Sequence, residues 1–131
     1  MGARYYNAAI ETMSADELHA LQMEKLARQL KYVVMHAPFH AAKLAAVGAA
    51  PGDITSLEDL AKLPFSEKSE LRQSQADAPP LGNHAAASLG DVVRVHASSG
   101  TTGTPSYVGL TRHDKARWSE CIARSYWCQG L

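Results

Sequence analysis

One stretch of the chain, residues 92–110 with the sequence VVRVHASSGTTGTPSYVGL, decides the fold. Residues 92–97 are β-branched with partial alternation of polarity, and residues 107–110 form a second short run of this kind. Both runs favour strands. The residues between them are too polar for a hydrophobic core, so the stretch predicts a β-hairpin that presents a polar loop.

The loop between the two strands, residues 98–105, has a composition suited to holding an anion. It contains five hydroxyl side chains and two glycines in eight residues. Glycine lets the backbone reach positive φ and approach a ligand closely, so consecutive N–H groups can converge on one anion. We therefore predict phosphate binding by the backbone and hydroxyl groups of Ser98, Ser99, Gly100, Thr101, Thr102, Gly103 and Thr104.

Composition alone leaves a second interpretation of this loop open. Segments rich in glycine, serine and threonine are common in surface turns that bind nothing. The Walker pattern is absent, because Gly100 and Gly103 are too close together and no Gly-Lys-Ser/Thr follows them. The loop is thus either a phosphate cradle of another kind or a polar surface turn.

A helix is expected directly after the second strand. Thr111 and Asp114 have the spacing of a capping box with Asp in place of Glu. On this helix Cys121 and Cys128 would be about 10 Å apart along the axis, beyond disulfide reach, and no partners at metal-ligand spacing accompany them. We expect reduced, buried thiols and a buried face formed by Trp118, Cys121, Ile122, Ser125 and Tyr126.

The first part of the chain is patterned as a small helical bundle. Ser14 and Glu17 have capping-box spacing, which predicts a helix over 15–36 that ends before Pro38. Its apolar positions recur at helical spacing. A second helix is expected over 39–47 with Gly48 as its left-handed stop, and Ser56 and Ser66 are expected to cap two short helices.

The pattern changes from helical to strand and turn chemistry near Pro79-Pro80. We therefore divide the chain into a helical subdomain, residues 1–78, and a second unit, residues 79–131. The predicted fold class is α+β: a helical bundle followed by a β-hairpin with its loop and a helix.

Charge and hydropathy exclude several classes of partner. Thirteen Lys and Arg balance thirteen Asp and Glu. Without a net positive field we expect no nucleic-acid partner and no binding to an anionic membrane. No apolar run reaches the length of about 18 residues that a spanning helix needs, and the first residues lack a signal-peptide core. We expect a cytoplasmic protein.

Several residues together resemble one enzyme family. The motif at 98–105 resembles the phosphate-binding signature of adenylate-forming enzymes, and its flanks at 94–97 and 108–111 resemble the phenylacetate-CoA ligase branch. Segments 5–7, 10–12, 36–39 and 56–65 resemble successive landmarks of that family's N-terminal region, in the same order. The resemblance covers nearly the whole chain.

This resemblance implies an acid–thiol ligase of which the chain is the N-terminal portion, a fragment of the larger α/β adenylate-forming fold. ATP and an aryl acid would give an acyl-adenylate and pyrophosphate, and CoA would then displace AMP to form a thioester. The implied co-substrates are ATP with Mg²⁺ and CoA. The family's acyl pocket, acidic magnesium ligand and mobile lid would lie beyond Leu131, so we assign no catalytic residue and no metal ligand here, and we expect the fragment alone to be inactive.

One position departs from the family pattern. Thr104 stands where the family commonly has lysine, and the nearest cations in sequence are Arg94, Arg112 and Lys115. The loop therefore lacks a fixed positive charge, which bears on how tightly ATP is held.

Other interpretations stay open for the remaining candidates. His36 and His40 have the spacing of a zinc-binding helix, but Pro38 between them favours surface or capping roles. His96 could touch a nucleotide or be satisfied within the sheet. A non-catalytic helical interaction module is the alternative function, and the unpaired strand edges predict self-association or a homodimer.

Overall fold

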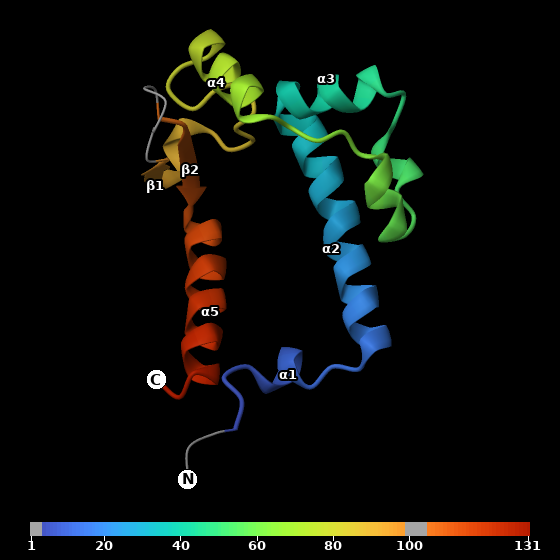
Figure 1. Cartoon of the computed structure of the whole chain (residues 1–131), viewed down its shortest axis with the longest axis vertical. Helices are drawn as coiled ribbons and strands as arrows, with labels where there is room; N and C mark the ends of the chain where they lie inside the picture. Colours follow the sequence, from blue (N-terminus) through green and yellow to red (C-terminus); the bar gives the residue numbers. More distant parts are fainter. Residues whose placement is uncertain (1–3, 99–104) are drawn as a thin grey trace.

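The structure, a computed structural model, describes residues 4–98 and 105–131. Its elements confirm the predicted class, helices followed by one two-stranded antiparallel sheet and a final helix (Figure 1). In chain order they are α1 (Ala8–Glu11), α2 (Ala15–His36), α3 (Pro38–Ala46), η1 (Pro51–Asp53), η2 (Glu58–Lys62), α4 (Lys68–Asp77), η3 (Leu89–Asp91), β1 (Val92–Ala97), β2 (Tyr107–Thr111) and α5 (Arg112–Cys128).

The elements form an open frame. Helices α2 and α5 form the two long sides of this frame. They are joined at one end by α3, α4 and the hairpin, and at the other end by α1 (Figure 1). The accessible surface is 9166 Å². A compact monomer of 14.1 kDa would expose only roughly 6,700 Å². The frame therefore leaves an unusually large share of its surface open for contact.

Helix α2 has the bounds that its capping box predicts. Glu17 N donates to Ser14 Oγ at 3.2 Å, and Ser14 N donates to the Glu17 carboxylate at 2.8 Å. The Ser14 N–H and the Ser14 hydroxyl both donate to the Glu17 carboxylate and lower its pKa, the backbone N–H most. Leu30 is the buried residue of α2, whereas Leu18 is exposed, so most of its apolar face is only partly covered.

The helices that follow differ in part from the predictions. Pro38 is the first residue of α3, and Gly48 has the predicted positive φ of 65°. The expected Ser66 cap is wrong, since Glu67 is the N-cap of α4 and its N–H donates to the Glu70 carboxylate. Glu70 also forms an ion pair with Lys43 of α3 at 2.6 Å, which lowers its pKa and ties α4 to α3. The helix extends to Asp77 instead of ending near Leu71.

The segment 79–87 connects the helical part to the hairpin. Tyr32 Oη of α2 donates to the Ala86 carbonyl at 3.2 Å, and the Phe39 N–H of α3 donates to the Asn83 carbonyl at 3.3 Å. Ser74 of α4 is buried and accepts a hydrogen bond from the His84 N–H at 3.2 Å. The segment thus contacts three helices that are distant in sequence.

Two histidines meet at this junction. His84 Nδ1 lies 2.9 Å from Ser74 Oγ, and the His84 and His40 rings both contact Phe39. Burial, together with the charge of Lys43, lowers the pKa of His40. Burial, together with His40, lowers the pKa of His84. The folded chain therefore favours neutral imidazoles here.

The free energy of unfolding should therefore fall as the pH is lowered through the ordinary histidine pKa of 6.5. Below that pH the unfolded chain binds protons that the folded chain, with its lower histidine pKa values, does not yet bind. His84→Asn keeps a polar atom near the position of Nδ1 and removes the titration, so it should flatten the slope. Urea unfolding between about pH 5.5 and 7.5 measures both chains. Equal slopes in the two would contradict this role of His84.

The hairpin packs on the connecting segment through a glycine. In β2, Gly109 pairs with Val95, and the buried Leu81 lies over its Cα. A Cβ at Gly109 would come 2.7 Å from Leu81 Cδ1 and 3.1 Å from Val92 Cγ2. Only glycine therefore fits this place without a shift of the neighbouring side chains.

We expect Gly109→Ala to destabilise the chain by about 1–3 kcal/mol, the usual cost of overpacking. Gly90→Ala is the matched control, because a Cβ there would meet only Ser88 Oγ at 3.8 Å. Thermal unfolding of both variants provides the comparison. If both variants lost the same free energy of unfolding, the close approach of Leu81 would not be the reason for glycine at position 109.

Candidate phosphate-binding site

The predicted loop is anchored by a pair of serines at its two ends. Ser98 N donates to the Ser106 carbonyl at 2.9 Å, and Ser106 N donates to Ser98 Oγ at 2.9 Å. These bonds extend the β1–β2 ladder beyond Ala97 and Tyr107. Of the predicted phosphate-binding residues, the structure therefore places Ser98; the others, Ser99, Gly100, Thr101, Thr102, Gly103 and Thr104, lie outside the described residues.

The ladder register determines which side chains share a face with the loop anchor. His96 pairs with Val108, and the Ser98–Ser106 pair lies two positions further along the ribbon. Paired residues point to the same face, and the face repeats every second residue. His96 and Ser106 therefore lie on one face of the hairpin.

Helix α5 covers part of this face. The Trp118 ring stacks on the His96 ring, with centroids 4.8 Å apart and planes inclined by 32°. Yet His96 Nε2 and Ser106 Oγ are both buried without a hydrogen-bond partner in the part of the chain that the structure describes. One interpretation of His96 expected the sheet to satisfy its hydrogen bonds. Among the described residues, the sheet offers no such partner to Nε2.

The start of α5 is joined to β2 without a linker. Asp114 N donates to Thr111 Oγ1 at 3.2 Å, and Thr111 N donates to the Asp114 carboxylate at 2.9 Å, as its capping spacing predicts. The Thr111 N–H and the Thr111 hydroxyl both donate to the Asp114 carboxylate and lower its pKa, the backbone N–H most. The box fixes α5 against the strand that leads away from the loop.

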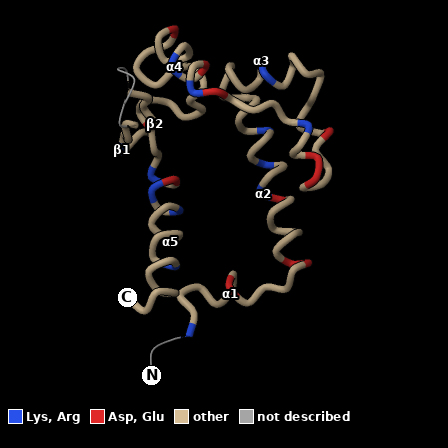
Figure 2. The backbone as a smooth tube through the Cα atoms, in the orientation of Figure 1, with Lys and Arg blue, Asp and Glu red and all other residues tan. Residues whose placement is uncertain are grey.

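The cations nearest to the loop in sequence are exposed. Arg94 lies on β1, and Arg112 and Lys115 lie in the first turns of α5. None of them forms an ion pair with a described residue. Figure 2 shows acidic and basic positions on both α2 and α5, so neither helix carries charge of one sign only.

The predicted burial of the α5 face is wrong for this chain. Trp118, Ile122 and Tyr126 expose 46%, 44% and 53% of their surface. Cys121 and Cys128 are free, as expected, but they are exposed, not buried. Helical periodicity identified one side of the helix correctly, yet within the described ranges 4–98 and 105–131 this side stays about half exposed, with Trp118 stacked on His96 of β1.

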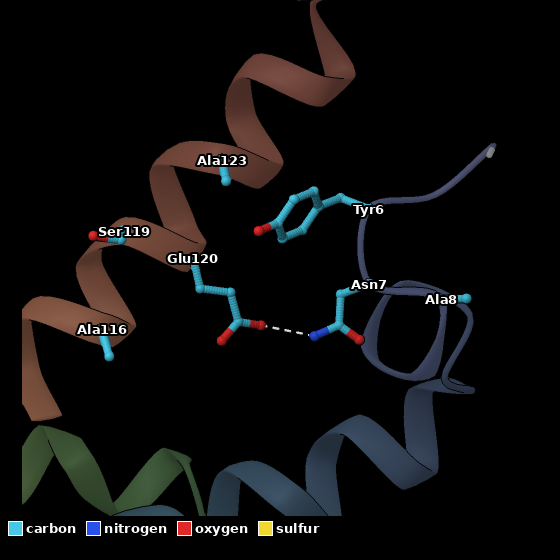
Figure 3. A pocket seen from close by; sticks show the side chains of 7 residues that line it. All are labelled: Tyr6, Asn7, Ala8, Ala116, Ser119, Glu120 and Ala123. Carbon is cyan, nitrogen blue, oxygen red and sulfur yellow. Dashed lines mark hydrogen bonds between the residues drawn. The ribbon is translucent and has the colours of Figure 1, made fainter. Parts of the chain in front are cut away.

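The opposite side of α5 is held by the N-terminal segment. Asn7 Nδ2 donates to Glu120 at 2.7 Å across a cleft of about 720 Å³, and Tyr6 lines the same cleft (Figure 3). The Arg124 guanidinium donates to the Glu11 carboxylate at 3.0 Å. These hydrogen bonds tie the N-terminal segment to α5.

Metal binding finds no support in the described residues. No group of three or more His, Cys, Asp or Glu side chains there could hold a metal ion. The His36 ring contacts Tyr32, and the His40 ring contacts Phe39. No helix among the described residues is both long and apolar enough to cross a membrane.

Curated relatives of the chain are phenylacetate-coenzyme A ligases. The one from Pseudomonas putida is 45% identical over 116 residues, 88% of this chain and 25% of that protein. The one from Thermus thermophilus is 42% identical over 120 residues, 92% of this chain and 26% of that protein. The chain thus spans about a quarter of the length of the curated relatives it matches. No protein-family model matches it.

Solved structures of 2-hydroxyisobutyryl-CoA ligase share the fold. One in complex with 2-HIB-AMP and CoA, in the thioesterification state, aligns with a TM-score of 0.90 and 35% identity over 98% of this chain and 27% of that chain. An open conformation aligns with a TM-score of 0.89 and 33% identity, over 98% of this chain and 30% of that chain. The described frame is thus part of a larger adenylate-forming fold, and the chain is similar to phenylacetate-coenzyme A ligases over about 90% of its own length.

Proposed function

We propose that the chain is the N-terminal portion of an ATP-dependent CoA ligase for an aryl acid such as phenylacetate. The observation that carries this proposal is the loop at 98–105, with its ends joined by Ser98 and Ser106, in a chain 45% identical to a phenylacetate-coenzyme A ligase. The aryl acid is preferred to a hydroxy acid because that identity exceeds the 35% to 2-hydroxyisobutyryl-CoA ligase.

The loop would act on the phosphates of ATP. Attack of a carboxylate on the α-phosphate makes pyrophosphate the leaving group, and its charge grows as the bond breaks. Backbone N–H groups and hydroxyls that already point at the β- and γ-phosphates would stabilise this charge without rearranging. Ser98, Ser99, Gly100, Thr101, Thr102, Gly103 and Thr104 would supply those donors. CoA would then displace AMP, in the cytoplasm where both co-substrates are available.

The division of the chain follows from this proposal. Residues 1–78 would be a helical subdomain, and residues 79–131 would begin the adenylation domain. The contacts of the segment 79–87 with α2, α3 and α4 support a firm connection between the two units. The loop would therefore be held at a defined position relative to the helices.

The experiment for this proposal is a titration with magnesium-ATP, followed by amide NMR in a longer protein that includes the region after Leu131. The amide signals of residues 98–106 should shift with one saturable dependence. If these signals stay in place, the loop is a surface turn. The chain is then better explained as a helical assembly module, which the exposed α5 face would serve.

Self-association of the separate chain is expected on the same grounds. The α5 face of Trp118, Ile122 and Tyr126 is about half exposed. The described sheet has only two strands, so each strand also has an open edge. Light scattering across a concentration series should show a mass that rises with concentration. Trp118→Ser combined with Tyr126→Ser should shift this rise to higher concentration. A monomer at all concentrations would contradict the expectation.

A further inference from the structure

One side of helix α5 carries a row of large apolar side chains. Trp118, Ile122 and Tyr126 follow one another at intervals of four residues, so they share one side of the helix and span about 12 Å along its axis. They are about half exposed, with 46%, 44% and 53% of their surface accessible. Cys121 lies beside them, three residues after Trp118, and is exposed as well. We refer to Trp118, Ile122 and Tyr126 as the apolar row.

The row lies on a helix that is held from two other directions. Its first member, Trp118, stacks on His96 of β1 with ring centroids 4.8 Å apart. The opposite side of α5 is tied to the N-terminal segment, where Arg124 forms an ion pair with Glu11 at 3.0 Å. A roll of α5 that buried the row within the frame would break both contacts. The row is therefore an outer surface of the frame that the described residues build.

The chemistry of the row predicts an apolar cover. Its three side chains carry no charge, and a charged group that lost its water against them would be destabilised. The chain as a whole has no net charge that would attract a polyanion. Its accessible surface lies roughly 2,500 Å² above that of a compact monomer of this mass, and each partner in a standard protein interface buries about 800 Å². The frame therefore has enough open surface for a protein as its cover.

Two observations favour the rest of a ligase over a second copy as this cover. The frame is retained at a TM-score of 0.90 in a 2-hydroxyisobutyryl-CoA ligase of which it makes up only 27%, so the same fold occurs within a much longer chain. The row also begins at the hairpin that carries the loop at 98–105, where the proposed reaction needs the acid and the α-phosphate to be held together. A second copy would bring another loop of the same kind and would not complete that site.

We propose that the apolar row of α5 is the surface on which the other three quarters of the ligase dock, through aliphatic and aromatic side chains. This contact places that larger region beside the hairpin, and so beside the phosphate loop. The inference rests on the proposed function, because it takes the chain to be the N-terminal portion of an aryl-acid CoA ligase. It adds the surface through which the two portions meet.

Labelling of Cys121 by iodoacetamide measures the cover directly. The test compares the separate chain, at a concentration where light scattering gives the monomer mass, with a hybrid ligase in which this chain replaces the corresponding quarter of the Pseudomonas putida enzyme. Trypsin cuts after Arg117 and Arg124, so the peptide 118–124 contains Cys121 as its only thiol, and mass spectrometry can follow it in both proteins. In the hybrid, Cys121 should react at least about tenfold more slowly, at every protein concentration. Gln22→Cys, at an exposed position of α2, is the control and should react at similar rates in the two proteins.

A charge in the middle of the row gives an independent readout. Ile122→Asp should lower the melting temperature of the hybrid by about 5 °C or more, because docking would bury an unpaired carboxylate. In the separate chain, where Ile122 is 44% exposed, the same change should lower it by only about 2 °C or less. Gln22→Asp also places Asp at an exposed helix position and should have an equally small effect in both proteins. Equal shifts for Ile122→Asp in the two proteins would contradict the docking, and labelling of Cys121 decides the question without any substitution in the row.

The outcomes distinguish this inference from the proposed function. If the hybrid exchanges labelled pyrophosphate into ATP but its Cys121 reacts as fast as in the separate chain, the inference is overturned and the proposed function stands. If the hybrid protects Cys121 but catalyses no exchange with phenylacetate, the docking surface stands and the proposed function is overturned. Protection of Cys121 that disappears when the hybrid is diluted would assign the row to a second copy and overturn the inference. Equal protection of the thiol at position 22 would also overturn it, because the cover would then not be specific to the row.

Discussion

The 131-residue chain, supplied with ATP, Mg²⁺ and phenylacetate, is expected to release no pyrophosphate above the uncatalysed background. Adenylation requires the carboxylate and the α-phosphate to be held together in attack geometry. The chain spans only about a quarter of the length of its curated relatives. Phosphate donors alone cannot position both reactants.

The matched comparison is a hybrid ligase in which this chain replaces the corresponding quarter of the Pseudomonas putida enzyme. With the same substrates the hybrid should release pyrophosphate, so the expected difference from the separate chain is the whole activity. A coupled pyrophosphate assay at equal protein concentration measures both. Turnover by the separate chain would mean that a complete site lies within its 131 residues.

Gly103→Ala in the hybrid ligase should raise the KM for ATP by about tenfold or more. A Cβ at this loop position would obstruct positive φ or crowd a phosphate that approaches the backbone N–H groups. Loss of one such donor in a preorganised anion site commonly costs about 10²–10³ in rate. Because residues 98–105 are too polar in sequence for a hydrophobic core, the melting temperature should change by only a few degrees.

Initial rates over a range of ATP concentrations, with thermal unfolding of the same samples, test this expectation. Gly90→Ala is the control, because a Cβ there meets no close neighbour. Unchanged ATP kinetics in Gly103→Ala would remove the glycine requirement on which the cradle depends. A large fall in melting temperature would instead assign Gly103 to folding.

Elements encoded by neighbouring residues could be predicted from the sequence. The capping boxes of Ser14 with Glu17 and of Thr111 with Asp114 each depend on residues three apart, and both are present in the structure. The same holds for the hairpin, whose two β-like runs pair with one register shift between Val92 and Arg94. These features need no information about distant parts of the chain.

Features that depend on distant contacts were not predictable. The Glu70 carboxylate, which accepts a hydrogen bond from the N–H of the N-cap Glu67 of α4, is also held by Lys43 of α3, 27 residues away in sequence. Periodicity showed which residues of α5 share a side but could not say what would cover Trp118 and Tyr126. The same applies to the packing of Leu81 over Gly109.

The candidate site also has one part that the sequence predicts and one part that only the structure reveals. Its loop residues could be named from the glycine and hydroxyl pattern alone, whereas Ser106 was not identified, because its unsatisfied hydroxyl becomes apparent only with the strand register and the Ser98 anchor. The position of Ser106 directly after the loop proline is the signal that could have drawn attention to it.

The most direct measurement for the central claim is acid-dependent exchange of labelled pyrophosphate into ATP by the hybrid ligase. This exchange reports adenylation alone, and it requires the loop of this chain to bind pyrophosphate. The account predicts exchange that depends on phenylacetate and falls strongly in the Gly103→Ala variant. A hybrid that folds with the circular dichroism and melting behaviour of the Pseudomonas putida enzyme but catalyses no exchange would contradict it.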